Sequence, residues 1–196
     1  MPQVEQLFGL AGAVQSDVAA LAVSIGPGSF TGLRIGLTTA KTLAYAWGKP
    51  IVGAPTLEAL AYGCPCADGW VAALLDAQKG RVYRAIYRWQ AGRLCEVSPV
   101  EIAPATAVVA ELAALPAPVM LVGESVREHR ALIDATNGRV VAAPEAALMP
   151  RAAVVALLGY EKWQQGTAVR PEELNPFYVR RAEAEELWER RLREQA

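Results

Sequence analysis

Residues that could do chemistry gather first in one glycine-rich run, Gly26-Pro27-Gly28-Ser29-Phe30-Thr31-Gly32. The apolar residues 20–25 predict a buried strand before it, and the pattern after it predicts a helix that Ser29 or Thr31 can cap. Backbone N–H groups at a helix N-terminus attract anions, so this is the arrangement of a phosphate loop. The named phosphate motifs do not fit, because a Walker loop needs a lysine and the dinucleotide fingerprint has one residue fewer before its last glycine. Phosphate binding by this loop alone is therefore disfavoured.

Asp76 is the second candidate, because it stands at the end of the apolar run 70–75, just before a predicted turn at Gly80. An acid in such a place can orient a metal ion or a water molecule in a phosphotransferase. The alternative, which we favour, is an aspartate that hydrogen-bonds its own turn.

Metal ligands are sparse. Cys64 and Cys66 form a C-x-C pair, but a zinc site needs two more ligands. Cys95 is distant in sequence, and His129 is the only histidine, within a charged predicted helix. We expect no metal site, and a solvent-facing, inert His129.

The helix predicted over 32–47 has two faces. One is apolar at spacings of three and four, as in a helix that packs on a core: Leu33, Leu37, Ala40, Ala44 and Trp47. The other places Gly32, Gly36 and Ala40 four residues apart, although a glycine inside a helix costs about 1 kcal/mol relative to alanine. Either another backbone approaches this face closely, or the glycines merely fit an internal packing site.

The remaining elements predict an α/β protein. Residues 2–14 read as an amphipathic helix, residues 70–75, 82–89 and 94–102 as a three-stranded meander, and the following residues as alternating helices and strands. The turn-rich break at 63–69 divides the chain into an N-terminal lobe, 1–66, a C-terminal lobe, 67–174, and a C-terminal segment, 175–196. That last segment is predicted to end in a charged helix, on which Trp188 and Leu192 form a narrow apolar stripe.

Composition limits the function. Hydrophobic residues make up 53% of the 196 residues, charged residues make up 20%, and the net charge is −1. That charge does not demand the basic patch by which proteins grip tRNA phosphates directly. No apolar run is long enough for a transmembrane helix, so we expect no membrane contact. Three cysteines fit a reducing cytoplasm better than a disulfide framework.

Four segments resemble the bacterial TsaB (YeaZ) family. The run from Gly26 to Gly36 looks like the family signature, and residues 53–60 are similar to its G-x-x-T-L-x-x-L. Residues 76–83 and 176–180 resemble two further motifs, so the similarity covers nearly the whole chain. Gln78 and Arg81 depart from the family's arginine and glutamate, which weakens any charge-based role at that hairpin.

The resemblance implies an actin-like, sugar-kinase-like (ASKHA, ribonuclease H-like) two-lobe fold. Family members carry a three-stranded meander before the first helix, which this sequence lacks, so we expect an incomplete N-terminal lobe. Met1 would then be an internal start, or the chain a fragment.

It also implies a non-catalytic subunit of the complex that forms N6-threonylcarbamoyladenosine at position 37 of tRNAs. The implied partners are the catalytic subunit TsaD in a heterodimer, the ATPase TsaE, and a second copy when the chain is alone; tRNA is reached only through the complex. No cofactor is implied, except ATP or ADP at a subunit interface. The alternatives are an ATP-binding actin-like phosphotransferase and an inactive glycoprotease-like protein; a metallopeptidase would need paired histidines.

The resemblance places the sites as follows. The motif loop is Gly26, Pro27, Gly28, Ser29, Phe30, Thr31 and Arg34, and Asp76 is the residue expected nearest to any nucleotide. The partner-binding residues lie on the first two helices: Val4, Leu7, Phe8, Ala11, Gly32, Leu33, Ile35, Gly36, Thr39, Ala40 and Leu43.

Overall fold

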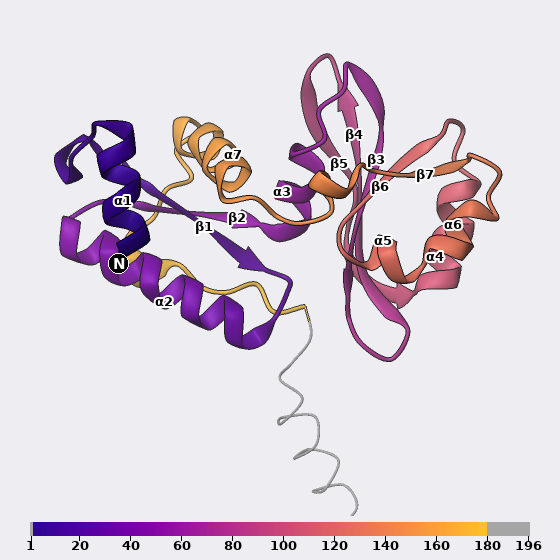
Figure 1. The fold of residues 1–196 in the computed structure, drawn as a ribbon, viewed down its shortest axis with the longest axis horizontal. Helices are drawn as coiled ribbons and strands as arrows, with labels where there is room; N and C mark the ends of the chain where they lie inside the picture. Colours follow the sequence, from indigo (N-terminus) through magenta and orange to yellow (C-terminus); the bar gives the residue numbers. More distant parts are fainter. Residues whose placement is uncertain (1, 180–196) are drawn as a thin grey trace, which may run out of the picture.

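The computed structural model describes residues 2–179 and shows two lobes, each built around its own sheet (Figure 1). The predicted charged helix at 181–195, with Trp188 and Leu192, lies outside the described residues.

The first lobe is a parallel pair of strands, β1 (Leu21–Gly26) and β2 (Ile51–Pro55), joined by helix α2 (Phe30–Trp47). Helix α2 lies along one face of the pair and α7 (Ala152–Gln164) covers the other (Figure 1). The strand predicted at 20–25 is thus covered on both faces, as its apolar sequence indicated. Within residues 2–179 it pairs only with β2, so its side chains stay half-buried.

The second lobe has a five-stranded sheet in the order β5-β4-β3-β6-β7. The predicted meander is confirmed, because β3, β4 and β5 are antiparallel neighbours, while β6 and β7 add in parallel beside β3. The strands are β3 (Asp68–Asp76), β4 (Arg81–Gln90), β5 (Arg93–Pro104), β6 (Val119–Val122) and β7 (Val140–Ala142).

Helices cover both faces of this sheet. Helix α3 (Thr56–Tyr62) packs on the face toward the first lobe, and three helices lie on the far face (Figure 1). These are α4 (Ala105–Ala113), α5 (Ser125–Glu128) and α6 (Arg130–Asp134). The charged helix predicted around His129 is interrupted at that residue, and the His129 side chain is half-buried rather than solvent-facing as expected. The main core surrounds β3, whose run Val71–Leu75 is buried throughout, as the central strand of a covered sheet requires.

Contacts between the lobes cross the boundaries drawn from sequence. Leu57 and Leu60 of α3 belong to the core of the second lobe, although they precede the break at 63–69. Val155 and Leu158 of α7 pack on the first lobe, beside Ala54. Helices α3 and α7 also pack on each other, with Ala59 beside Val155 and Leu158, so together they form the junction of the two lobes.

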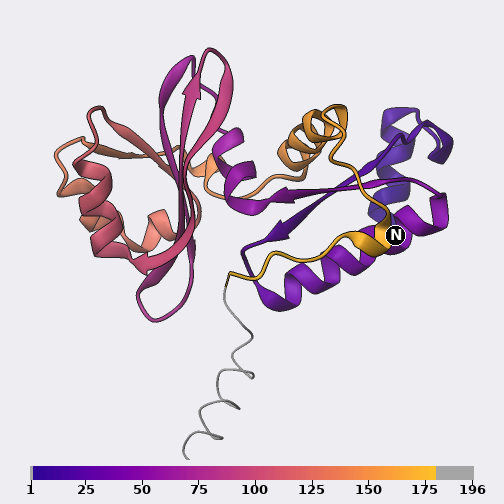
Figure 2. The same cartoon turned by 180° about the vertical axis from the view of Figure 1, so that it is seen from behind.

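The chain returns to the first lobe after α7. Val169 forms an isolated antiparallel bridge with Ile51, and Leu174 enters the core formed with Leu37 and Ala44. From there residues 169–177 run beside α2, as the view from behind shows (Figure 2). The first helix is α1 (Pro2–Ala11), and a short 3₁₀ turn, Gln15–Asp17, follows it. Two further 3₁₀ turns are Glu145–Ala147, after β7, and Pro171–Glu173, within the returning segment.

Candidate functional site

The glycine loop is held by the returning segment. The Phe177 N–H donates a hydrogen bond to the Ile25 carbonyl at 2.8 Å. Gly26 has φ +115°, and a Cβ atom there would lie 2.6 Å from the Phe177 carbonyl oxygen. The first position of the motif therefore requires glycine, because its φ is positive and the backbone of Phe177 leaves no room for a side chain.

Ser29 caps α2, as predicted. Its Oγ accepts a hydrogen bond from the Gly32 N–H at 3.3 Å. This bond satisfies one of the amide donors that a phosphate would otherwise take. The helix end remains exposed, with Thr31 at the surface and Pro27 buried beneath the loop.

An aromatic–arginine cluster forms the outer side of the loop. The Arg34 Cζ lies 4.1 Å from the centroid of the Phe30 ring, and that ring is 5.3 Å from the ring of Tyr178. Arg34 Nε also donates to the Tyr178 hydroxyl at 3.4 Å. The cluster joins the first and last of the motifs quoted above, a contact that no spacing in the sequence indicates.

The outer face of α2 meets no other part of the described chain at its glycines. A Cβ atom on Gly36 would find nothing within 4 Å, and one on Gly32 would touch only Ser29 of its own cap. Ile35 is 63% exposed, Thr39 is exposed and Leu43 is half-buried. Within residues 2–179 the glycines therefore do not serve internal packing.

Two residues predicted for the partner face point elsewhere. Leu33 and Ala40 pack against the core of the first lobe, beside Leu37. Both residues belong to the apolar stripe of α2, which faces the core. Ala40 also belongs to the stripe of small residues, because the two stripes overlap there. The predicted residues that remain on this face are Gly32, Ile35, Gly36 and Thr39, which are exposed, and Leu43, which is half-buried.

Helix α1 is also largely exposed and contacts the C-terminal end of α2. None of its residues is buried, and its ring contact with α2 is Phe8 on Trp47, with centroids 5.9 Å apart. Val4 and Phe8 are half-buried, whereas Ala11 is exposed and Leu7 is 66% exposed. Leu10, at 80% exposure, was not among the predicted residues, although its spacing of three from Leu7 is a helical signal.

Asp76 serves its own turn. Its Oδ1 accepts a hydrogen bond from the Gln78 N–H at 2.7 Å, in a turn where Gln78, Lys79 and Gly80 all have positive φ. This is the turn-bonding alternative favoured from the sequence.

The thiols are not activated. Burial raises the pKa of both Cys64 and Cys66, so both are protonated at neutral pH. In residues 2–179 no three His, Cys, Asp or Glu side chains are grouped so that they could hold a metal ion. Over the same residues, none of the helices is both long and apolar enough to cross a membrane.

Known proteins share this architecture. The family model described as "TsaD: tRNA N6-adenosine threonylcarbamoyltransferase" matches residues 1–188. The tRNA threonylcarbamoyladenosine biosynthesis protein TsaB of Bacillus subtilis is 35% identical over 96% of this chain and 81% of its own length. TsaB of Escherichia coli is 40% identical over 45% of this chain and 39% of its own length.

Solved structures agree. YeaZ from Pseudomonas aeruginosa superposes with a TM-score of 0.72 and 28% identity, over 91% of this chain and 81% of that one. A second Pseudomonas aeruginosa structure, described as similar to peptidase YEAZ, gives a TM-score of 0.76 and 30% identity over 91% and 82%. The expected actin-like α/β fold is confirmed by these matches. The chain belongs to the TsaB (YeaZ) family of tRNA threonylcarbamoyladenosine biosynthesis proteins.

Proposed function

We propose that this chain is a non-catalytic subunit of the complex that forms N6-threonylcarbamoyladenosine at position 37 of tRNAs. In this proposal it supports the catalytic subunit TsaD by binding it through α1 and the outer face of α2. The names of its relatives support the pathway, and the family model that matches it describes the threonylcarbamoyltransferase itself.

The single observation that carries the proposal is the uncovered outer face of α2. Gly36 has open space where a Cβ atom would stand, and Ile35 beside it is 63% exposed. Leu7 and Leu10 of α1 add two more exposed apolar side chains. Burying each such side chain in an interface stabilises it by about 1.5–3 kcal/mol, so this surface favours a protein partner over water.

The small residues on α2 determine how closely a partner can approach. A helix without side chains at Gly32 and Gly36 lets another helix approach backbone to backbone, as small residues spaced by four do elsewhere. The partner is then a helix pair rather than a nucleic acid, which would need basic residues on this face. The same surface on a second copy would give a homodimer when TsaD is absent.

Support for a non-catalytic role comes from the candidate residues. The Asp76 carboxylate accepts a hydrogen bond within its own turn, and both cysteines of the C-x-C pair have raised pKa values. A metallopeptidase would need paired histidines, and this sequence contains one histidine.

The test is Gly36→Leu against the matched control Thr38→Leu. Both positions are exposed on α2, but Thr38 lies nearly opposite Gly36 around the helix. We expect both variants to fold, with circular dichroism spectra like the parent. Gly36→Leu should lose co-purification with TsaD and the support of tRNA modification in a reconstituted reaction, while Thr38→Leu keeps both.

The outcomes separate the parts of the proposal. A folded Gly36→Leu that still binds TsaD would place the interface elsewhere. Modification of tRNA by the chain without TsaD would end the non-catalytic assignment.

A further inference from the structure

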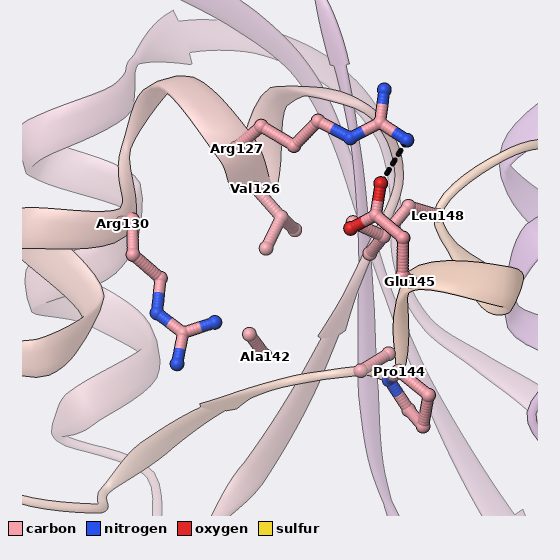
Figure 3. A pocket seen from close by; sticks show the side chains of 8 residues that line it. Val126, Arg127, Arg130, Ala142, Pro144, Glu145 and Leu148 are labelled. Atoms are coloured by element: carbon pink, nitrogen blue, oxygen red, sulfur yellow. Dashed lines mark ion pairs between the residues drawn. The ribbon is translucent and has the colours of Figure 1, made fainter.

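The second lobe contains a pocket that neither the sequence motifs nor the proposed function uses. It is a cavity of about 620 Å³ between α5, α6 and the segment that follows β7. This volume is in the range of small-molecule sites, which are about 300–1,000 Å³. Its lining combines an apolar floor with charged side chains at the rim (Figure 3).

The floor is fixed by the main core. Val126, Ala143 and Leu148 line the pocket and are 2%, 6% and 3% exposed. All three belong to the core cluster that surrounds β3. The shape of the pocket is therefore set by packing that folding already requires, and an apolar group that enters loses water contact without deforming the site.

Two guanidinium groups stand at the rim. Arg127 pairs with Glu145 across the pocket mouth, and Arg130 lies on the other side, with Val126 and Ala142 between them (Figure 3). Arg130 donates to Asp134 through Nε at 3.1 Å, and the end of its guanidinium is directed toward the pocket. Charge-assisted bonds from such groups are the strong ones in ligand recognition.

Both ion pairs are easily exchanged. The side chains of Arg127 and Glu145 are 53% and 70% exposed, and those of Arg130 and Asp134 are 64% and 62% exposed. Ion pairs between exposed side chains contribute little to stability, so a ligand anion can replace Glu145 on Arg127 at little cost. The Glu145 carboxylate thus occupies the place that a ligand carboxylate would take.

We infer that this pocket binds a small organic carboxylate with an apolar body. The apolar body would rest on Val126, Ala143 and Leu148, and the carboxylate would accept hydrogen bonds from Arg130 and from Arg127 released by Glu145. Arg127 pairs with Glu145 and Arg130 with Asp134, so a ligand that displaces Glu145 leaves one guanidinium group, that of Arg127, without its carboxylate. This balance suits a single negative charge better than the double charge of a phosphate monoester. The inference is independent of the proposed function.

The test is a titration of the ¹⁵N-labelled full chain with 3-phenylpropanoate, followed by NMR. We expect saturable shifts at the amides of residues 126–130 and 142–148. The neutral alcohol 3-phenylpropan-1-ol measures the apolar floor alone and should bind at least about tenfold more weakly, as the loss of a charge-assisted bond implies. Phenyl phosphate should bind no more tightly than the carboxylate.

Two variants and one control locate the charge. Arg130→Met should weaken carboxylate binding about tenfold or more, because it removes one guanidinium group and keeps an unbranched apolar stem. Glu145→Gln should strengthen it several-fold, because it removes the carboxylate that competes for Arg127. Arg93→Met, at an exposed arginine of the β4–β5 turn, should change nothing.

Each contrary result overturns the inference. With the parent chain, these results are the absence of saturable shifts at the pocket amides, an alcohol that binds as tightly as the carboxylate, and phenyl phosphate that binds more tightly than the carboxylate. With the variants, they are an unchanged carboxylate affinity in Arg130→Met and an unchanged or weaker carboxylate affinity in Glu145→Gln. Because no arm of the experiment involves TsaD or tRNA, failure here leaves the proposed function untouched.

Discussion

Gly159 of α7 packs directly on Ala22 of β1: a Cβ atom on Gly159 would lie 2.3 Å from the Ala22 Cβ. Gly36 of α2 offers the opposite case, because a Cβ atom there would meet nothing within 4 Å. Both glycines lie inside helices and both weaken them by propensity. Within residues 2–179 only the glycine on α7 has a close packing partner at its Cβ position.

This contrast predicts opposite effects of the same substitution. Gly159→Ala should lower the free energy of unfolding by up to about 2 kcal/mol, because an overpacking cost of about 1–3 kcal/mol is only partly offset by a helix-propensity gain of about 1 kcal/mol. Gly36→Ala should raise it by up to about 1 kcal/mol, since the gain meets no clash. Urea denaturation of both variants measures the difference.

A compensating change provides the control for Gly159. Ala22→Gly removes the methyl group that Gly159→Ala would strike, so the double variant should be more stable than the sum of the single effects. Strict additivity would show that the two positions do not touch.

Gly26 and Gly28 make a second matched pair within one motif. Gly26→Ala should destabilise the protein by about 2 kcal/mol or more, because φ is +115° and the Phe177 carbonyl oxygen would lie 2.6 Å from the new Cβ. Gly28→Ala should change the stability by less than about 0.5 kcal/mol, because nothing lies within 4 Å of its Cβ position. Chemical denaturation of both variants is the measurement. Equal losses would mean that the loop tolerates no side chain at all, whatever its contacts.

Sequence patterns predicted the local features well. The apolar stripe of α2, the Ser29 cap and the β3–β4–β5 meander follow from spacing and residue type, and all three are present. These features depend on residues close together in the chain or on strands joined by short turns. The motif loop could be placed for the same reason.

Long-range contacts could not be predicted in this way. Gly26 is required by the backbone of Phe177, which lies close to it, and Gly159 by the side chain of Ala22. No periodicity in the sequence links positions so far apart. The sequence places Leu33 and Ala40 both on the apolar core stripe and among the partner-binding residues that the resemblance implies, and only the packing shows that they contact the core. The sequence does not indicate the pocket at Arg127 and Arg130, because the apolar residues of its floor have the same types and spacing as other core residues.

The aromatic–arginine cluster predicts a coupled pair of substitutions. Tyr178→Ala should destabilise the protein by about 1 kcal/mol, because it removes the ring contact with Phe30. Tyr178→Phe should cost much less, since the 3.4 Å hydrogen bond from Arg34 is long and exposed.

Arg34→Met should cost about 0.5–1 kcal/mol, the size of an exposed cation–π contact. A double-variant cycle of Arg34→Met with Tyr178→Ala, by thermal denaturation, should show coupling; independent effects would show that the cluster is three separate side chains.

Tyr62 predicts a change of stability with alkaline pH. Burial, together with its hydrogen bond to Glu161, raises the pKa of Tyr62 from 10.0 to about 12. A phenol whose pKa is raised by folding stabilises the folded state fully below its unfolded pKa, and this contribution is lost as pH rises through the folded pKa. Stability should therefore fall between about pH 10 and 12.

Two variants attribute part of that fall to Tyr62. Tyr62→Phe removes the titrating group, so its stability should decline less steeply over this range than that of the parent. Some slope will remain, because burial also raises the pKa of Tyr87. Glu161→Gln removes the neighbouring negative charge and should shift the Tyr62 titration to lower pH, which ultraviolet difference absorbance of the phenolate follows directly. A Tyr62→Phe variant with the same slope as the parent would show that Tyr62 titrates alike in the folded and unfolded chains.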